Sequence, residues 1–186
     1  MNRAPETETI LRHWREAVPS DRLAHLVKDA TRALVRALQV RLAKHKVSFG
    51  HWAFLRILWE RDGLTQRKLS ELAGVMEPTT FSALQAMQRL GYIVRRHAGG
   101  NRKNVYVFLT AKGRHLKTVL VPLAETVNNV AVRGVAVADV DTTRAVLLAI
   151  ITNLAQDERM SDARMPSTRA LGPAARPRKQ AARRLK

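Results

Sequence analysis

The sequence predicts a mainly α-helical protein with one small β-hairpin, and two observations lead to this fold class. Apolar residues recur with a period of about 3.6 along most of the 186 residues, as on the buried stripe of an amphipathic helix. Between residues 92 and 109 the apolar period shortens to about two, which is typical of strands. An apolar content of 46% is sufficient to build a core in a chain of this length.

Composition excludes several classes of protein. The chain has no cysteine, so disulfides and thiolate metal sites are not available to it. No apolar run reaches the roughly 18 residues that span a membrane, and residues 1–10 lack the apolar segment of a signal peptide. We therefore expect a cytoplasmic protein with no membrane partner.

Positive charge is concentrated in two segments. The net charge is +18, and residues 78–124 and 164–186 each hold eight Lys or Arg and no acid, which leaves +2 for the rest of the chain. A solvated helical surface usually mixes charges of both signs, so a long acid-free segment within a folded region indicates a surface for a polyanion. The alternative is a basic surface that binds nothing.

Four helices are expected before the strands. Residues 6–18 place Ile10, Leu11 and Trp14 on one stripe, which predicts a short docking helix within residues 1–19. A second helix keeps its apolar stripe from Leu23 to Leu42, longer than a small monomer core requires. A third covers HWAFLRILWE and stops near Asp62. A fourth helix is expected to have Thr65 as its N-terminal cap and to end at Gly74. We expect Leu69, Leu72 and Ala73 of this helix to face the core.

The stretch EPTTFSALQAMQRLGY predicts the second helix of a helix-turn-helix. At 100° per residue, one side of it carries small and apolar residues: Thr80, Ala83, Leu84, Met87 and Gly91. The outward side carries short polar groups and one arginine, flanked by a threonine and a phenylalanine: Pro78, Ser82, Gln85, Arg89, Thr79 and Phe81. Such groups can contact phosphates and base edges, and a phenylalanine ring can contact a thymine methyl. An ordinary solvated face usually contains Glu and Lys instead, so we assign these residues to DNA.

Two strands with a basic loop follow this helix. Residues 92–94 and 105–109 alternate as strands do, and RRHAGGNRKN joins them. A hairpin with a cationic tip after a recognition helix forms a wing, which can place a basic side chain in a minor groove. The cations that we assign to DNA here are Arg95, Arg96, Arg102 and Lys103.

The order of these motifs resembles the MarR family of multiple-antibiotic-resistance-type regulators over about residues 21–156. The resemblance rests on LTQRKLSELAGV, EPTTFSALQAMQRLGYIVRR and VYVFLTAKG, whose Leu109-Thr110 and Gly113 match the family's Leu-Thr-x-x-Gly. It implies a winged helix-turn-helix fold, a homodimer and a double-stranded DNA partner. Two motifs depart from the family. Asn101 replaces the Asp of its Asp-x-Arg wing motif, and Ser82 stands where many members have Arg.

Besides the docking helix, three parts of the chain are expected, of which the resemblance implies the first two and the composition the third. Residues 20–47 and 114–156 would form the helical dimerisation region, and 48–113 the DNA-binding domain. The apolar character of 114–156 supports a dimer independently, and Pro122 is expected to bend or interrupt its first helix. Residues 157–186, which hold three prolines and few apolar residues, are expected to be a disordered basic tail. Two recognition helices about 34 Å apart would read a pseudo-palindromic operator.

We do not expect an enzyme or a metal site. The sequence has no glycine-rich phosphate loop, nucleophile elbow or paired carboxylates, and its six histidines lack helical metal-ligand spacing. The expected function is a transcriptional repressor without a cofactor. An architectural nucleic-acid-binding protein without an effector is the alternative, which the basic end of the chain would suit.

A small aromatic carboxylate is the expected effector, with the hydroxynicotinate or hydroxybenzoate type as the subgroup that the pattern resembles. An arginine with aromatic neighbours suits a carboxylate on a ring. Five residues of the docking helix and the third helix carry this expectation: His13, Trp14, Arg15, His51 and Trp52. The other interpretation, with the tryptophans in the core and the histidines in solvent, stays open at this point.

Overall fold

The computed structural model describes residues 6–16, 23–98 and 101–161, and it divides into two compact units. The first unit, Met1–Arg133, contains all but one of the helices and strands found in the described residues, and the second, Gly134–Lys186, contains one helix. The disordered tail was expected to begin at residue 157, but residues 157–161 are helical, because α7 (Val137–Ser161) continues to Ser161; the rest of the expected tail lies outside the described residues.

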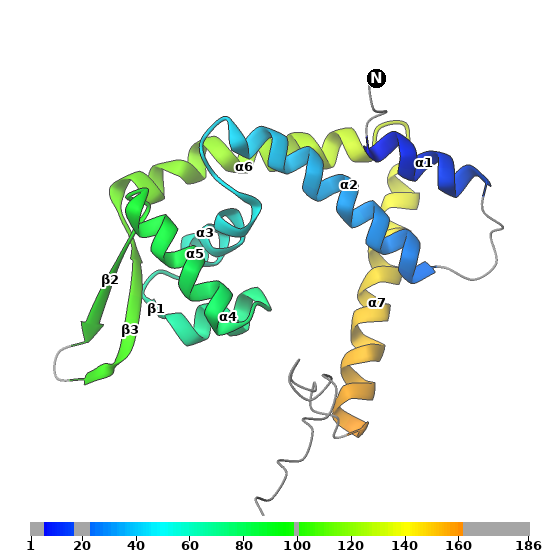
Figure 1. Ribbon diagram of the computed structural model, residues 1–186. Coiled ribbons are helices and arrows are strands. Elements are labelled where there is room, and N and C mark those ends of the chain that lie inside the picture. The colour runs from blue at the N-terminus through cyan, green and yellow to red at the C-terminus, as the bar shows by residue number, and fades with distance from the viewer. Residues whose placement is uncertain (1–5, 17–22, 99–100, 162–186) are drawn as a thin grey trace, which may run out of the picture. The chain divides into compact units, whose positions relative to one another are not determined.

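Helices dominate the first unit, as the apolar period predicts (Figure 1). Their order agrees with the expectation from the sequence, and Asp62 lies just beyond the third helix. The elements are α1 (Glu6–Glu16), α2 (Leu23–Ala43), α3 (Phe49–Glu60), β1 (Leu64–Thr65), α4 (Gln66–Ala73), α5 (Glu77–Arg89), β2 (Ile93–Ala98), β3 (Asn101–Leu109) and α6 (Ala111–Ala131). The fold class is therefore mainly α with a small β-wing.

Local sequence signals fix both ends of α4 and the start of α5, the two helices of the helix-turn-helix. The Thr65 side chain accepts a hydrogen bond of 3.1 Å from the amide of Lys68, so it caps α4 as predicted. Gly74 has φ 62° and closes the same helix in the left-handed conformation. Pro78 lies in the first turn of α5, where a missing amide hydrogen leaves no bond unmade. These signals set α5 directly after α4.

The sheet has three antiparallel strands in the order β1-β3-β2. Ile93 pairs with Leu109 and Arg95 with Val107, so β2 and β3 form the long hairpin that projects from the helices in Figure 1. β1 pairs Leu64 with Val107. We did not predict β1, because two residues are too few to show an alternating pattern.

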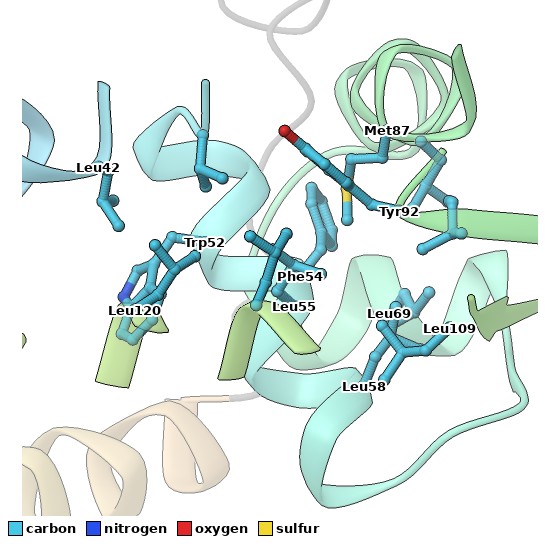
Figure 2. Packing of buried hydrophobic residues seen from close by; sticks show 14 of the residues in the cluster. Leu42, Trp52, Phe54, Leu55, Leu58, Leu69, Met87, Tyr92, Leu109 and Leu120 are labelled. Carbon is cyan, nitrogen blue, oxygen red and sulfur yellow. The ribbon is translucent and has the colours of Figure 1, made fainter. Parts of the chain in front are cut away.

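A single apolar cluster joins the helices of the first unit (Figure 2). Leu42 of α2, Leu55 of α3, Leu69 of α4, Leu84 of α5 and Leu120 of α6 are all completely buried. Each helix thus contributes its apolar stripe to one core, and this core holds α5 with its other face outward. Burial of each such side chain contributes about 1.5–3 kcal/mol.

Close packing at Gly113 joins the end of α5 to the start of α6. A Cβ atom at this glycine would lie 2.0 Å from the carbonyl oxygen of Tyr92, so only glycine fits. Thr110 Oγ1 donates to the Gly91 carbonyl at 2.6 Å, and Trp59 Nε1 donates to the Gly113 carbonyl at 2.9 Å. The Leu-Thr-x-x-Gly motif therefore anchors the wing to the helix before it.

One expectation about the helices was wrong, and one of the two outcomes expected at Pro122 does not occur. Leu72 is 52% exposed, because the buried side of α4 is centred between Leu69 and Ser70, and Leu72 lies about 110° from that centre. Ser70 can be buried there because its hydroxyl donates to the Val75 carbonyl. Pro122 does not interrupt its helix, since α6 continues through it.

The second unit consists of α7 (Val137–Ser161) within the described residues. None of its residues is buried, and its exposed side chains include large apolar ones: Val146, Leu147, Leu148, Ile151 and Leu154. No helix of the described residues, α7 included, is long and apolar enough to cross a membrane.

Candidate nucleic-acid interface

The two sides of α5 differ as the sequence predicts. Thr80, Leu84 and Met87 are completely buried, whereas the residues assigned to DNA on this helix are exposed: Pro78, Thr79, Phe81, Ser82, Gln85 and Arg89. The Ser82 hydroxyl donates to the Pro78 carbonyl at 3.1 Å, within the helix itself. The helix therefore presents an acid-free polar surface after Glu77, and the core fixes its orientation.

An arginine of the wing is held against this surface. Arg95 Nε donates a hydrogen bond of 2.6 Å to Gln88 Oε1, and its Cζ atom lies 5.4 Å from the centroid of the Phe81 ring. The wing and the recognition helix are thus connected through one guanidinium. The sequence analysis did not select Gln88. Its position seven residues after Phe81, two helical turns along the same face, was the available signal.

A polar hollow lies where α5 meets β2. It has a volume of about 540 Å³ and is lined by Gln85, Gln88, Arg89 and Arg95. Three of these residues were predicted to contact DNA. The hollow brings two guanidinium groups and two amides together, which is the chemistry that phosphates and base edges require.

The remaining predicted cations lie along the hairpin. Arg96 is exposed on β2 and pairs in register with Tyr106 of β3. Arg102 and Lys103 belong to the backbone of β3, but their side chains lie outside the described part of the chain, as do Gly99 and Gly100. For these two residues the structure therefore describes only their position in the strand.

Two acidic residues near this region, Asp62 and Glu71, bind groups other than the arginines assigned to DNA. Asp62 Oδ1 accepts from the Leu109 amide at 2.9 Å, and its Oδ2 lies 3.5 Å from Arg114 Nη1. On α4, the hydrogen bond and the charge of Lys68 lower the pKa of Glu71 from its ordinary value. Among the ion pairs of the described residues, none involves Arg89, Arg95 or Arg96. Their charges are therefore available to an external anion.

The residues predicted to bind an effector fall into two groups with different surroundings. On α1, which packs on α2, Trp14 Nε1 donates to Asp29 Oδ2 at 3.0 Å and the His13 ring lies edge-on to Trp14. Arg15 is exposed on the same helix. A helix is thus present within residues 1–19, and Trp14 connects it to α2.

The other group lies on α3. Trp52 is 5% exposed and belongs to the same core cluster as Leu120 (Figure 2). Its ring lies edge-on to that of Trp59. Burial lowers the pKa of His51 from its ordinary value of 6.5, so its imidazole is neutral at physiological pH. Its Nδ1 atom is buried without a hydrogen-bond partner among the described residues.

Two further hollows were not predicted. One of about 430 Å³ is lined by residues of α1 and α2, where Arg32 and Arg36 both bind the Glu6 carboxylate. The other, of about 290 Å³, lies between α3 and α4 and includes Trp52 and Arg56. Within residues 6–16, 23–98 and 101–161, no three His, Cys, Asp or Glu side chains are close enough to hold a metal ion.

This arrangement, a helix-turn-helix followed by a cationic hairpin, is that of the winged helix-turn-helix regulators. In a comparison with known proteins, residues 47–105 match the model of the MarR family. The family model covers the segment from the start of α3 to β3. The resemblance noted from the sequence motifs is thereby confirmed for the winged domain.

A curated relative supports the same assignment. The chain is 30% identical over 105 residues to the HTH-type transcriptional regulator TtmR of Methylorubrum extorquens, which is 56% of this chain. The match spans about half, 54%, of that relative's length.

Solved structures share the fold over most of the chain. A MarR family regulator of Listeria monocytogenes in complex with a 26-mer DNA has a TM-score of 0.66 and 22% identity, covering 78% of this chain and 99% of that one. Bordetella bronchiseptica BpsR, whose DNA binding is regulated by 6-hydroxynicotinic acid, has a TM-score of 0.63 and 18% identity, covering 73% and 99%. The curated relative is a transcriptional regulator, and the two solved structures share the fold of this chain.

Proposed function

We propose that the chain is a cytoplasmic, homodimeric transcriptional repressor that binds a pseudo-palindromic DNA operator through α5 and the β2–β3 wing. The observation that carries this proposal is the exposed, acid-free face of α5 with Arg95 of the wing held against it. The core fixes α5 from behind, so its polar face can enter a major groove without rearrangement. The solved regulator–DNA complex of the same fold supports this mode of binding.

A twofold dimer accounts for the apolar surface that the chain leaves exposed. Leu23, Leu26 and Leu34 of α2 and the apolar side chains of α7 are exposed in the single chain. Exposed large apolar side chains in such number are typical of an interface. A dimer would place two copies of α5 on one face of a duplex, one helical turn or about 34 Å apart.

The operator proposal is tested by the salt dependence of DNA binding. A duplex selected by the protein from a random pool would be titrated at several salt concentrations beside an unselected duplex. Neutralising about 6 to 10 phosphates gives a log-log slope of that order for both duplexes. Preference for the selected duplex must survive high salt if α5 reads bases, whereas equal affinities would favour an architectural binder. A slope near zero would contradict the electrostatic argument.

We further propose that a small aromatic carboxylate releases the protein from DNA. BpsR, a regulator of the same fold, is regulated by 6-hydroxynicotinic acid, and this supports the ligand class. Arg15, exposed beside His13 and Trp14 on α1, offers a guanidinium to the carboxylate, whereas His51 lies on α3 in the other group of predicted residues. A ligand that favours one arrangement of the helices changes DNA affinity by the ratio of its affinities for the two arrangements.

A thermal-shift screen tests this second proposal. The screen would use 6-hydroxynicotinic acid, hydroxybenzoates and benzoate, and each acid that raises the melting temperature would be added to the protein–DNA complex. Coupling of about 1–3 kcal/mol would weaken DNA binding roughly 5- to 150-fold. Arg15→Ala should abolish the response and leave ligand-free DNA binding intact. If no acid acts at millimolar concentration, the ligand class is wrong.

A further inference from the structure

Gln88 and Gln85 are neighbouring glutamines of α5 that face the same hollow, yet their amides differ in engagement. Gln88 Oε1 accepts the 2.6 Å hydrogen bond from Arg95 Nε, whereas no hydrogen bond from Gln85 to another described side chain is found. A glutamine that reads adenine uses its oxygen and its nitrogen together on one base edge. The oxygen of Gln88 already has a charged donor, so only Gln85 has both atoms free for a base.

Three contacts limit the freedom of the Arg95 side chain. Gln88 holds one edge of the guanidinium, the Phe81 ring lies 5.4 Å from its Cζ atom, and its backbone is fixed in the ladder opposite Val107. A guanidinium has five N–H donors, and Nε supplies one of them. The four donors on the terminal nitrogens are left for an anion.

The Arg95 guanidinium keeps its positive charge when it is held by Gln88. A glutamine fixes the guanidinium by a hydrogen bond without neutralising it, whereas a carboxylate at position 88 would cancel the charge. Arg95 forms no ion pair among the described residues, and Arg89 lines the same hollow. The site therefore presents an oriented and uncompensated cation beside the base-reading face of α5.

We propose that Gln88 is a positioning residue that orients Arg95 for a DNA phosphate and does not itself read a base. This inference rests on the proposed function and adds a division of labour to it: Gln85 reads sequence, and the Gln88–Arg95 pair supplies affinity that is independent of sequence. Holding the side chain in advance removes part of the entropy cost of ordering it on DNA. Gln88 thus increases affinity only when Arg95 is present.

A double-mutant cycle on the full chain tests this dependence. The variants are Gln88→Met, Arg95→Ala and the double mutant, because methionine keeps the length and helix propensity of glutamine but has no amide oxygen. The probes are a duplex selected from a random pool by the wild-type chain and an unselected duplex. Gln88→Met should weaken binding to both about two- to tenfold, the range expected from ordering one long side chain.

The other variants distinguish the loss of a charge from the loss of side-chain positioning. Arg95→Ala should reduce the log-log salt slope by about one, while Gln88→Met keeps the slope and the base preference of the wild type. In the Arg95→Ala background, Gln88→Met should change affinity less than twofold. Gln85→Ala is the matched control on the same face and should alter base preference whether or not Arg95 is present.

A measurement without DNA separates this inference from the proposed function. In the free, nitrogen-15-labelled protein, the Arg95 Nε–H resonance should exchange slowly with water in the wild type and rapidly in Gln88→Met. Equal exchange in the two proteins would overturn the positioning role, as would an equal loss of affinity for Gln88→Met with and without Arg95. A changed base preference in Gln88→Met would show that Gln88 reads DNA directly. If the wild-type chain binds no duplex, the proposed function fails, and this inference fails with it.

Discussion

Helices α5 and α7 use apolar residues in opposite ways. In α5 the apolar side chains form one stripe, which is completely buried at Leu84 and Met87, and the remaining surface is polar. In α7 no residue is buried, although the helix has more large apolar side chains than α5. One helix has its apolar surface covered within its own chain and the other does not.

If the proposed dimer forms, this difference separates the surface that one chain completes from the surface that its partner covers. The core alone positions α5, so the geometry of its outward face is a property of the single chain. The helix α7 exposes Leu148, Ile151 and Leu154 to water, and this arrangement is unfavourable by about 25 cal/mol for each Å² of apolar surface. Substitutions in the two helices should therefore act on different measurable quantities.

The largest expected effect is the loss of the dimer on introducing a charge into α7. Leu147→Asp would leave a carboxylate without a partner in an apolar interface, which costs about 3–5 kcal/mol. Sedimentation at micromolar concentration should show a dimer for the wild type and a monomer for the variant. Leu34→Asp on α2 should act in the same direction.

Asn153→Asp is the matched control on α7. It adds the same charge at an exposed polar position without changing the shape of the side chain. We expect the dimer to persist in this variant. A wild-type protein that sediments as a monomer at micromolar concentration would contradict the comparison itself.

A truncation in α5 should reduce stability instead of association. Leu84 is completely buried, so Leu84→Ala should lower the free energy of unfolding by about 2–5 kcal/mol. Leu148→Ala on α7 should affect a dilute, dissociated sample far less, because Leu148 is exposed in the single chain. Denaturant unfolding at low protein concentration measures both. Similar losses would mean that α7 packs within its own chain.

The outward face of α5 should determine which DNA sequences bind. Gln85→Ala should weaken discrimination at one position of each half-site by about 1–3 kcal/mol. Lys103→Ala should weaken binding with less change in preference, because a phosphate contact carries no sequence information. Competition with single-base variants of a selected duplex distinguishes the two. Equal losses on selected and unselected duplexes for Gln85→Ala would exclude it from base reading.

The sequence predicted those parts of the fold that depend on local signals. The caps at Thr65 and Gly74, the two faces of α5 and the hairpin after Tyr92 follow from residue type and period, and all are present. Leu72 was misplaced because an eight-residue helix gives too few apolar positions to fix the centre of its buried side. Strand β1 was missed for a similar reason, because its two residues are too few to show an alternating pattern.

The site was predictable residue by residue but not as a set of contacts. Exposure of Gln85 and Arg89 follows from helix geometry. The hydrogen bond between Gln88 and Arg95 depends on how β2 returns along α5, which no local pattern records. Likewise, the tryptophan at position 52 can belong to a core or a binding site by composition alone, and only tertiary packing places it beside Trp59.

The smallest expected effect is a gain in stability on the buried side of α5. Thr80 is completely buried, and its Oγ1 atom has no hydrogen-bond partner among the described residues. A buried hydroxyl without a partner costs about 1–3 kcal/mol relative to water. Thr80→Val keeps the branched shape and removes the hydroxyl, so it should raise the free energy of unfolding by about 1 kcal/mol and the melting temperature by roughly 2–4 °C. Thr79→Val, at the exposed neighbouring position, should change neither by more than about 0.5 kcal/mol. A loss of stability in Thr80→Val would show that this hydroxyl is paired in solution, for example with a bound water. The buried face of α5 would then include a polar interaction, and the contrast between α5 and α7 in the use of apolar residues would be weaker.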